Sequence, residues 1–203
     1  MYLVALSMIF ASLILVANIT AVKIISIGPE SIDAGIVAYP LTFLISDVIS
    51  EIYGKRTATK IVWMGFAVNI MMVSLIFIVG KIPPAPFWID QSAYDSILGS
   101  IPRIVAASML AFLISQNHDV LAFDMWKRVT KGKYLWFRNN ASTSVSQLID
   151  TVVFVIIAFA GTYSWGTIWS MIWVTYIIKL LVAVLDTPIL YFLVWKLRAV
   201  QSD

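Results

Sequence analysis

Six long apolar stretches, separated by shorter polar segments, run along the chain. The length of each stretch is similar to or greater than the roughly 20 residues that an α-helix needs to cross the hydrocarbon core of a bilayer. The pattern therefore predicts an all-α membrane protein, in which residues 1–203 form a single domain of six transmembrane helices. These helices are expected at residues 2–22, 36–53, 61–79, 104–126, 143–162 and 168–195.

The composition agrees with this interpretation. Of the 203 residues, 61% are hydrophobic and 12% are charged, whereas an ordinary soluble domain is about 45–50% apolar and about 25% charged. A soluble, disordered or collagen-like chain is thereby excluded. The sequence has no cysteine, which excludes disulfides and thiolate catalysis, and one histidine disfavours a multi-histidine metal site. We therefore expect no metal and no cofactor. A net charge of +3 is too small to indicate a nucleic-acid partner.

Basic residues indicate how the helices are oriented. Ten of the 14 lysines and arginines lie at residues 55–60, 127–138 and 196–198, which the six-helix arrangement places on one side of the membrane. The opposite loops carry only Lys23, Lys81 and Arg103. Because cytoplasmic loops are enriched in Lys and Arg, both termini are predicted to be cytoplasmic. A lipid- or partner-docking role for the basic loops is the alternative.

Five ionisable side chains lie inside the predicted helices, where they are costly and mark a functional site by default. With a rise of about 1.5 Å per residue, the four carboxylates lie roughly 9–14 Å from the cytoplasmic ends of four different helices. Such groups can also simply bond helices together, at around 0.6 kcal/mol per hydrogen bond, but one packing contact does not need four acids. The five residues are Asp47, Asp119, Asp150, Lys179 and Asp186.

Two glutamines extend this polar layer. Gln116 and Gln147 each lie three residues before an aspartate of the layer, so each shares a helix face with that aspartate. The two pairs belong to a short repeat, Ser-Gln-x-x-Asp, at residues 115–119 and 146–150. The repeat is either the remnant of an inverted repeat or a coincidence.

Lys179 and Asp186 lie two turns apart on nearly the same helix face. They are candidates for an ion pair, formed directly or through a neighbour, that rearranges on substrate binding or takes part in a proton-coupled step. Asp47 is a candidate gate or proton carrier.

Three sequence motifs resemble the signatures of a known family. Residues 39–54 read YPLTFLISDVISEIYG, residues 136–151 read WFRNNASTSVSQLIDT, and Lys179 is followed by Asp186-Thr187-Pro188. They look like the three signatures of the queuosine precursor transporters, a vitamin-uptake-like family, and the resemblance covers nearly the whole chain. It implies a bacterial inner-membrane importer of 7-deazaguanine bases, such as 7-cyano- and 7-aminomethyl-7-deazaguanine, for tRNA modification. The implied fold is similar to the substrate-binding subunits of energy-coupling-factor vitamin transporters.

The polar layer suits such a base chemically. A 7-deazaguanine presents an N1–H and an exocyclic NH₂ to a carboxylate, and its carbonyl oxygen needs a donor such as Lys, Gln or Asn. We predict that Asp150 and Gln147 bind the base edge, with Asn140 or Asn139 nearby. The other predicted substrate-binding residues are Lys179, Asp186, Asp47, Gln116 and Asp119.

Alternative functions belong to different classes. A stand-alone importer competes with a substrate-binding subunit that needs an energising complex, because Ala17-x-x-x-Ala21 resembles the docking motif of such subunits. An intramembrane enzyme is disfavoured, since the chain has neither Cys nor an H-E-x-x-H motif. A structural or assembly factor would tolerate neutral replacement of the buried acids. The expected partners are a small molecule and the bilayer, and a homodimer is left open.

Overall fold

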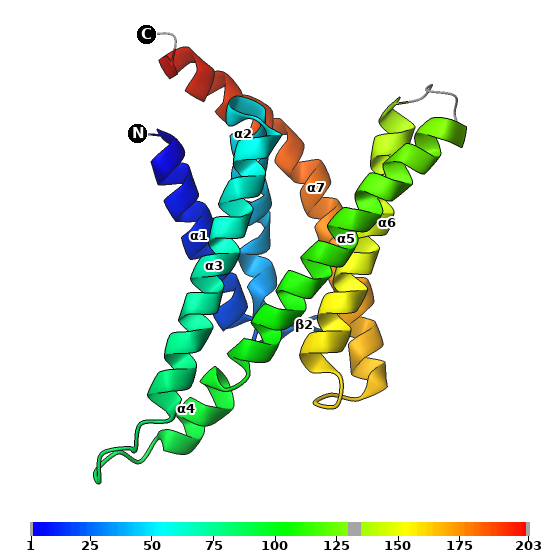
Figure 1. The fold of residues 1–203 in the computed structure, drawn as a ribbon. Helices are drawn as coiled ribbons and strands as arrows, with labels where there is room; N and C mark the ends of the chain where they lie inside the picture. Colours follow the sequence, from blue (N-terminus) through cyan, green and yellow to red (C-terminus); the bar gives the residue numbers. More distant parts are fainter. Residues whose placement is uncertain (1, 130–134, 202–203) are drawn as a thin grey trace. The chain divides into compact units, whose positions relative to one another are not determined.

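The computed structural model describes residues 2–129 and 135–201, and it describes side chains at 2–118, 121–122, 125, 144–185, 188–190 and 192–195. The chain is mostly helical (Figure 1). Its helices are α1 (Tyr2–Thr20), α2 (Tyr39–Tyr53), α3 (Lys55–Gly80), α4 (Gln91–Leu98), α5 (Ile101–Val129), α6 (Leu135–Phe159) and α7 (Trp165–Gln201). Between α1 and α2 lie strands β1 (Ile24–Ile27) and β2 (Glu30–Asp33), which pair, and the 3₁₀ helix η1 (Ala34–Val37).

Several of these helices can cross a membrane. Within the described residues, four helical segments are long and apolar enough to do so: Tyr2–Thr20, Lys55–Gly80, Gln91–His118 and Trp165–Trp195. A shorter apolar helix covers Ser144–Phe159. The prediction of a helical, multi-pass membrane protein is therefore confirmed in its main feature. The number of six spans and the cytoplasmic position of both termini stay predictions.

The second apolar stretch begins later than its hydropathy predicts. Residues 34–37 form η1, which Asp33 caps by accepting a hydrogen bond from the Gly35 N–H at 3.1 Å. Helix α2 starts only at Tyr39, with Pro40 in its first turn, where the missing N–H of proline is tolerated. At 15 residues, α2 is about 22 Å long. It is thus shorter than the roughly 30 Å hydrocarbon core.

The chain divides into two compact units. One contains Met1–Ile25, Asp33–Val105 and Leu181–Asp203, and the other contains Ser26–Ile32 and Ala106–Leu180. We call them the first and the second unit. Helices α5 and α7 therefore contribute to both.

In the first unit, α1, α2 and α3 pack against one another (Figure 1). Their apolar core centres on Phe10, Ile49, Ala58 and Ile61. A buried polar contact joins α1 to α3, where Asn18 donates to the Asn69 side-chain oxygen at 2.7 Å. Asn69 in turn donates to the Gly65 carbonyl of its own helix at 2.9 Å, so the amides of this pair hold two helices together in apolar surroundings.

The turn η1 lies directly on the end of α1. A Cβ atom added to Gly35 would lie 2.7 Å from the Ala17 carbonyl oxygen and 3.1 Å from the Ala21 Cβ. Only glycine fits such a close approach of two backbone segments. The Ala17-x-x-x-Ala21 pattern therefore packs within this unit, as small residues in membrane helices commonly do.

In the second unit, α6 lies beside both α5 and α7 (Figure 1). The apolar residues at its core are almost fully buried, and they come from the three helices. They are Ala107, Ala111, Val155, Ala158, Ile168, Met171 and Ile172. Polar side chains occupy the part of this unit that holds most of the predicted site.

Candidate functional site

An ion pair joins α6 to α7 in the second unit. The Lys179 ammonium donates to Oδ2 of Asp150 at 2.7 Å. The Lys179 side chain is 6% exposed, whereas that of Asp150 is 21% exposed. A lysine so deeply buried needs an anion close by, because an unpaired charge in low dielectric costs several kcal/mol. Asp150 supplies that anion, and its side chain stays partly exposed.

A third helix reaches the same carboxylate. Ser115 of α5 donates to Oδ1 of Asp150 at 3.4 Å, a long hydrogen bond, and shares its hydroxyl with the Phe112 carbonyl at 3.2 Å. Asp150 thus has one oxygen held by a strong charged contact and the other by a weak one. The weakly held oxygen is the easier one for another donor to take.

Two further polar contacts lie near the ion pair along the same helices. His118 Nδ1 of α5 and Ser146 Oγ of α6 are 3.0 Å apart. The Tyr176 hydroxyl of α7 donates to the Ser144 carbonyl oxygen of α6 at 3.3 Å. Ser146 and Asp150 are four residues apart and share a face of α6. The three helices are therefore connected to one another by polar groups at more than one level.

The structure places the predicted site residues unequally. Asp150 and Lys179 are brought together. Gln147 is partly buried one turn before Asp150, and its backbone carbonyl accepts from Thr151 at 2.8 Å. Gln116 is exposed, although Ser115 beside it contacts Asp150.

The other predicted residues either belong to the first unit or have side chains that the structure does not describe. Asp47 is an exposed residue of α2 and belongs to the first unit. The side chains of Asn139, Asn140, Asp119 and Asp186 lie outside those that the structure describes.

The carboxylate that the structure describes beside Lys179 comes from a neighbouring helix. Asp186 was the expected partner because it lies two turns further along the same helix. Asp150 of the neighbouring helix α6 contacts Lys179, while the side chain of Asp186 lies outside the described residues, so its pairing with Lys179 stays a prediction. Spacing within one helix reveals a shared face, but it does not reveal which residue of another helix packs against that face.

Four residues of this group were not predicted as site residues: Ser115, His118, Ser146 and Tyr176. The internal repeat carried a signal for two of them, because its copies begin at Ser115 and Ser146. Ser115 of the first copy contacts Asp150 of the second, and Ser146 of the second copy contacts His118 within the first. The two copies therefore face each other in an antiparallel register.

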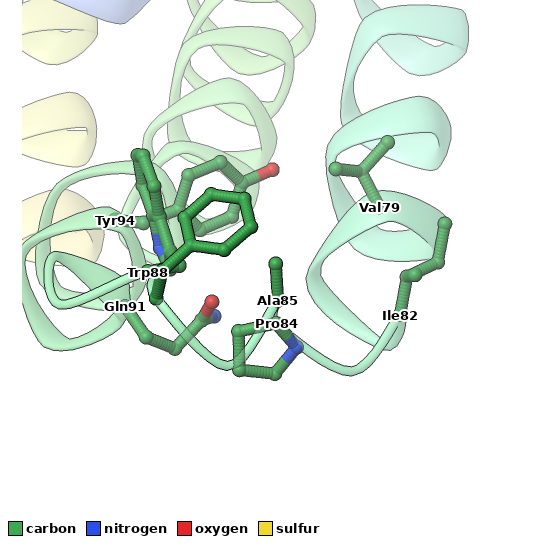
Figure 2. A pocket seen from close by; sticks show the side chains of 8 residues that line it. Val79, Ile82, Pro84, Ala85, Trp88, Gln91 and Tyr94 are labelled. Atoms are coloured by element: carbon green, nitrogen blue, oxygen red, sulfur yellow. The ribbon is translucent and has the colours of Figure 1, made fainter.

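A cavity of about 300 Å³ lies in the first unit, where α3 ends and α4 begins. Figure 2 shows Trp88, Gln91 and Tyr94 on one side of it and Val79 and Ile82 on the other. Pro84, Ala85 and Phe87 complete its lining. The lining contains no predicted site residue and is mostly apolar, and its aromatic side chains are those expected at a membrane interface. Among the described residues, no group of three or more His, Asp or Glu side chains could hold a metal ion.

Comparison with known proteins identifies the family. The profile of the family described as "Putative vitamin uptake transporter" matches residues 33–193. The chain belongs to this family. The match includes the helices that carry Asp150 and Lys179, and it confirms the prediction made from the three sequence motifs. No solved structure matches the chain.

Named relatives of this vitamin uptake transporter family come from three bacteria. A Bacillus subtilis protein named "Probable queuosine precursor transporter" is 36% identical over 177 residues, which are 86% of this chain and 77% of that protein. The Escherichia coli "Queuosine precursor transporter" is 28% identical over 125 residues, 62% of this chain and 54% of that protein. A Haemophilus influenzae relative, also named "Probable queuosine precursor transporter", is 26% identical over 125 residues, 62% and 51% of the two chains. A transporter role in a membrane follows from this membership and from the apolar helices.

Proposed function

We propose that this chain imports 7-deazaguanine bases, the precursors of queuosine, across the bacterial inner membrane. The names of the relatives support the substrate class, and one observation supports the mechanism. It is the Asp150–Lys179 pair, in which a carboxylate and an ammonium lie together inside apolar helices while part of the carboxylate stays accessible.

The base edge of a 7-deazaguanine complements this pair. The edge presents a carbonyl oxygen, an N1–H and an exocyclic NH₂ in a row, that is, an acceptor followed by two donors. Asp150 accepts from the two donors, and Lys179 donates to the carbonyl oxygen. The base then separates the two charged groups without leaving either one unpaired.

This exchange explains why an ion pair suits a cargo whose base edge is neutral. Without substrate, Asp150 and Lys179 satisfy each other, and the site avoids the cost of two unpaired buried charges. With substrate, each charge keeps a hydrogen-bonded partner. The weak contact of Ser115 with the second carboxylate oxygen is the one that the exocyclic NH₂ replaces. We propose that the base also contacts Gln147, which lies one turn away on the same helix, and Asn140.

Uptake of radiolabelled 7-cyano-7-deazaguanine by proteoliposomes that contain only the purified protein tests this proposal. Accumulation of unmodified base above the level of protein-free vesicles supports a stand-alone importer and not an enzyme. Binding in detergent without uptake in vesicles favours the alternative, a substrate-binding subunit that needs an energising complex. If the protein neither binds nor takes up 7-cyano- or 7-aminomethyl-7-deazaguanine, the proposed substrate class is wrong.

A further inference from the structure

One buried hydroxyl in the second unit has no hydrogen-bond partner among the described residues. It is the side chain of Thr175 in α7, a residue that is only 3% exposed. A hydroxyl buried away from water loses free energy unless it is bonded, so buried polar atoms are nearly always satisfied in native structures. An exception inside a membrane helix therefore requires an explanation.

The usual partner of such a hydroxyl is a carbonyl of its own helix. Thr57 and Thr59 donate to the carbonyl four residues earlier, at 2.8 and 2.9 Å. Thr151 of α6 is fully buried and donates to the Gln147 carbonyl at 2.8 Å. Thr175 makes no such bond, so the hydrogen-bonding capacity of its hydroxyl is unused within the described residues.

The position of Thr175 connects it to the ion pair. It precedes Lys179 by four residues, so the two side chains are neighbours on one face of α7. That face is the buried one, since Ile168, Met171 and Ile172 on it are each 1% exposed. The unpartnered hydroxyl thus lies one helical turn from the Lys179 residue whose ammonium contacts Asp150.

We propose that the Thr175 hydroxyl is a substrate-binding group that donates to the carbonyl oxygen of the base beside Lys179. This inference rests on the proposed function. A carbonyl oxygen has two lone pairs, so it accepts from the ammonium and from the hydroxyl at the same time. A site with two donors at this point selects for bases that carry a strong acceptor there, because any other group leaves buried donors unpaired.

Thr175→Val removes the hydroxyl and retains the shape of the side chain. The expected result is an affinity for 7-cyano-7-deazaguanine that is about tenfold weaker, with a thermal midpoint no lower than that of the wild type. The thermal midpoint is not expected to fall, because the substitution removes an unsatisfied polar atom. Thr151→Val is the matched control, since that hydroxyl is equally buried but already bonded. It should lower the midpoint and leave the affinity within about twofold.

Two further measurements make the result specific to the carbonyl contact. Thr175→Ser retains the hydroxyl and should restore binding. The thiocarbonyl analogue of the base keeps the N1–H and NH₂ but is a weaker acceptor, so Thr175→Val should reduce its binding by much less than tenfold. If Thr175→Val does not fold, a wild-type protein that binds the oxygen and sulfur bases equally well overturns the inference. If the wild-type protein binds 7-cyano-7-deazaguanine and Thr175→Val binds it with the same affinity, the inference on Thr175 is wrong. The proposed function is unaffected by that result. If the wild-type protein binds neither base, both this inference and the proposed function are wrong.

Discussion

Lys179 and Asp150 lie 29 residues apart in the sequence and on different helices, and their charged atoms are 2.7 Å apart. The pair is asymmetric in its surroundings, because the lysine side chain is almost completely buried and the carboxylate is not. The aspartate is therefore the more accessible partner of the pair. The first three predictions below test this pair, and the other two follow from other features of the protein.

Replacing Asp150 with Asn should abolish uptake while the protein remains in the membrane. An amide cannot accept from both donors of the base edge, and it leaves the Lys179 ammonium without its anion. Since hydrogen bonds to charged groups are worth about 1.5–3 kcal/mol, we expect binding to weaken by roughly 10- to 100-fold. Equilibrium binding of 7-cyano-7-deazaguanine to the purified variant measures this. Asp95→Asn, at an exposed position of α4, is the control and should bind as the wild type does; equal binding by both variants would show that Asp150 only packs.

Replacing Lys179 with Met should lower both thermal stability and uptake. Removing one partner of a buried pair costs about 3–5 kcal/mol in soluble proteins, and the partial exposure of Asp150 reduces that figure here. The double variant Lys179→Met, Asp150→Asn should recover stability but not uptake, because a neutral pair packs but cannot exchange partners with a base. Thermal unfolding of the single and double variants gives the coupling energy.

The same cycle with Asp186→Asn tests the pairing that helix spacing predicted. If Lys179 depends on Asp150 alone, the losses of stability from Lys179→Met and Asp186→Asn should add. A coupling as large as that with Asp150 would show that Lys179 is shared between two carboxylates. Strictly additive losses in both cycles would contradict the ion-pair mechanism.

Gly35→Ala should destabilise the first unit. The added Cβ would lie 2.7 Å from the Ala17 carbonyl oxygen and 2.8 Å from an Asp33 carboxylate oxygen, so the backbone must move. Such overpacking typically costs about 1–3 kcal/mol. Gly166→Ala in the first turn of α7 is the control, because its nearest side-chain contact would be at 3.9 Å. Comparable thermal midpoints of the two variants would rule out a close approach at Gly35.

Topology can be checked with reporter fusions. The distribution of basic residues predicts that a reporter after Lys131 is cytoplasmic and that one inserted at Pro84 is extracytoplasmic. Paired phosphatase and fluorescent-protein fusions at both positions distinguish the two sides. A cytoplasmic signal at Pro84 would require a different number of spans.

Hydropathy predicts the helices well because long apolar runs in a bilayer have few alternatives to a helix. It predicts their ends less well. The start of α2 is shifted by η1, which depends on one side-chain cap from Asp33. The β1–β2 hairpin and α4 were not predicted. The two strands have four residues each and α4 has eight, which is too short for a long periodic pattern.

The candidate site was predicted in part, for a similar physical reason. Buried charges stand out in an apolar sequence, so Asp150 and Lys179 could be singled out before their contact was known. The hydroxyl groups were harder to single out, because a hydroxyl costs little in a membrane helix, and the internal repeat was the one signal for Ser115 and Ser146. Ser115 and Thr175 acquire meaning only from what lies beside them in space.

Because Asp150 and Lys179 neutralise each other, the pair affects how much electrical work is done in the transmembrane potential. Moving one elementary charge through the transmembrane potential is worth about 2.3 kcal/mol per 100 mV. A site that pairs one negative with one positive group carries no net charge, and a neutral base adds none. Under the proposed function, such a site reorients with little electrical work whether it is empty or holds a neutral base. Under the proposed function, the membrane voltage alone cannot concentrate the neutral 7-cyano-7-deazaguanine inside the cell, and its accumulation depends on a coupled ion or on a reaction that consumes the base.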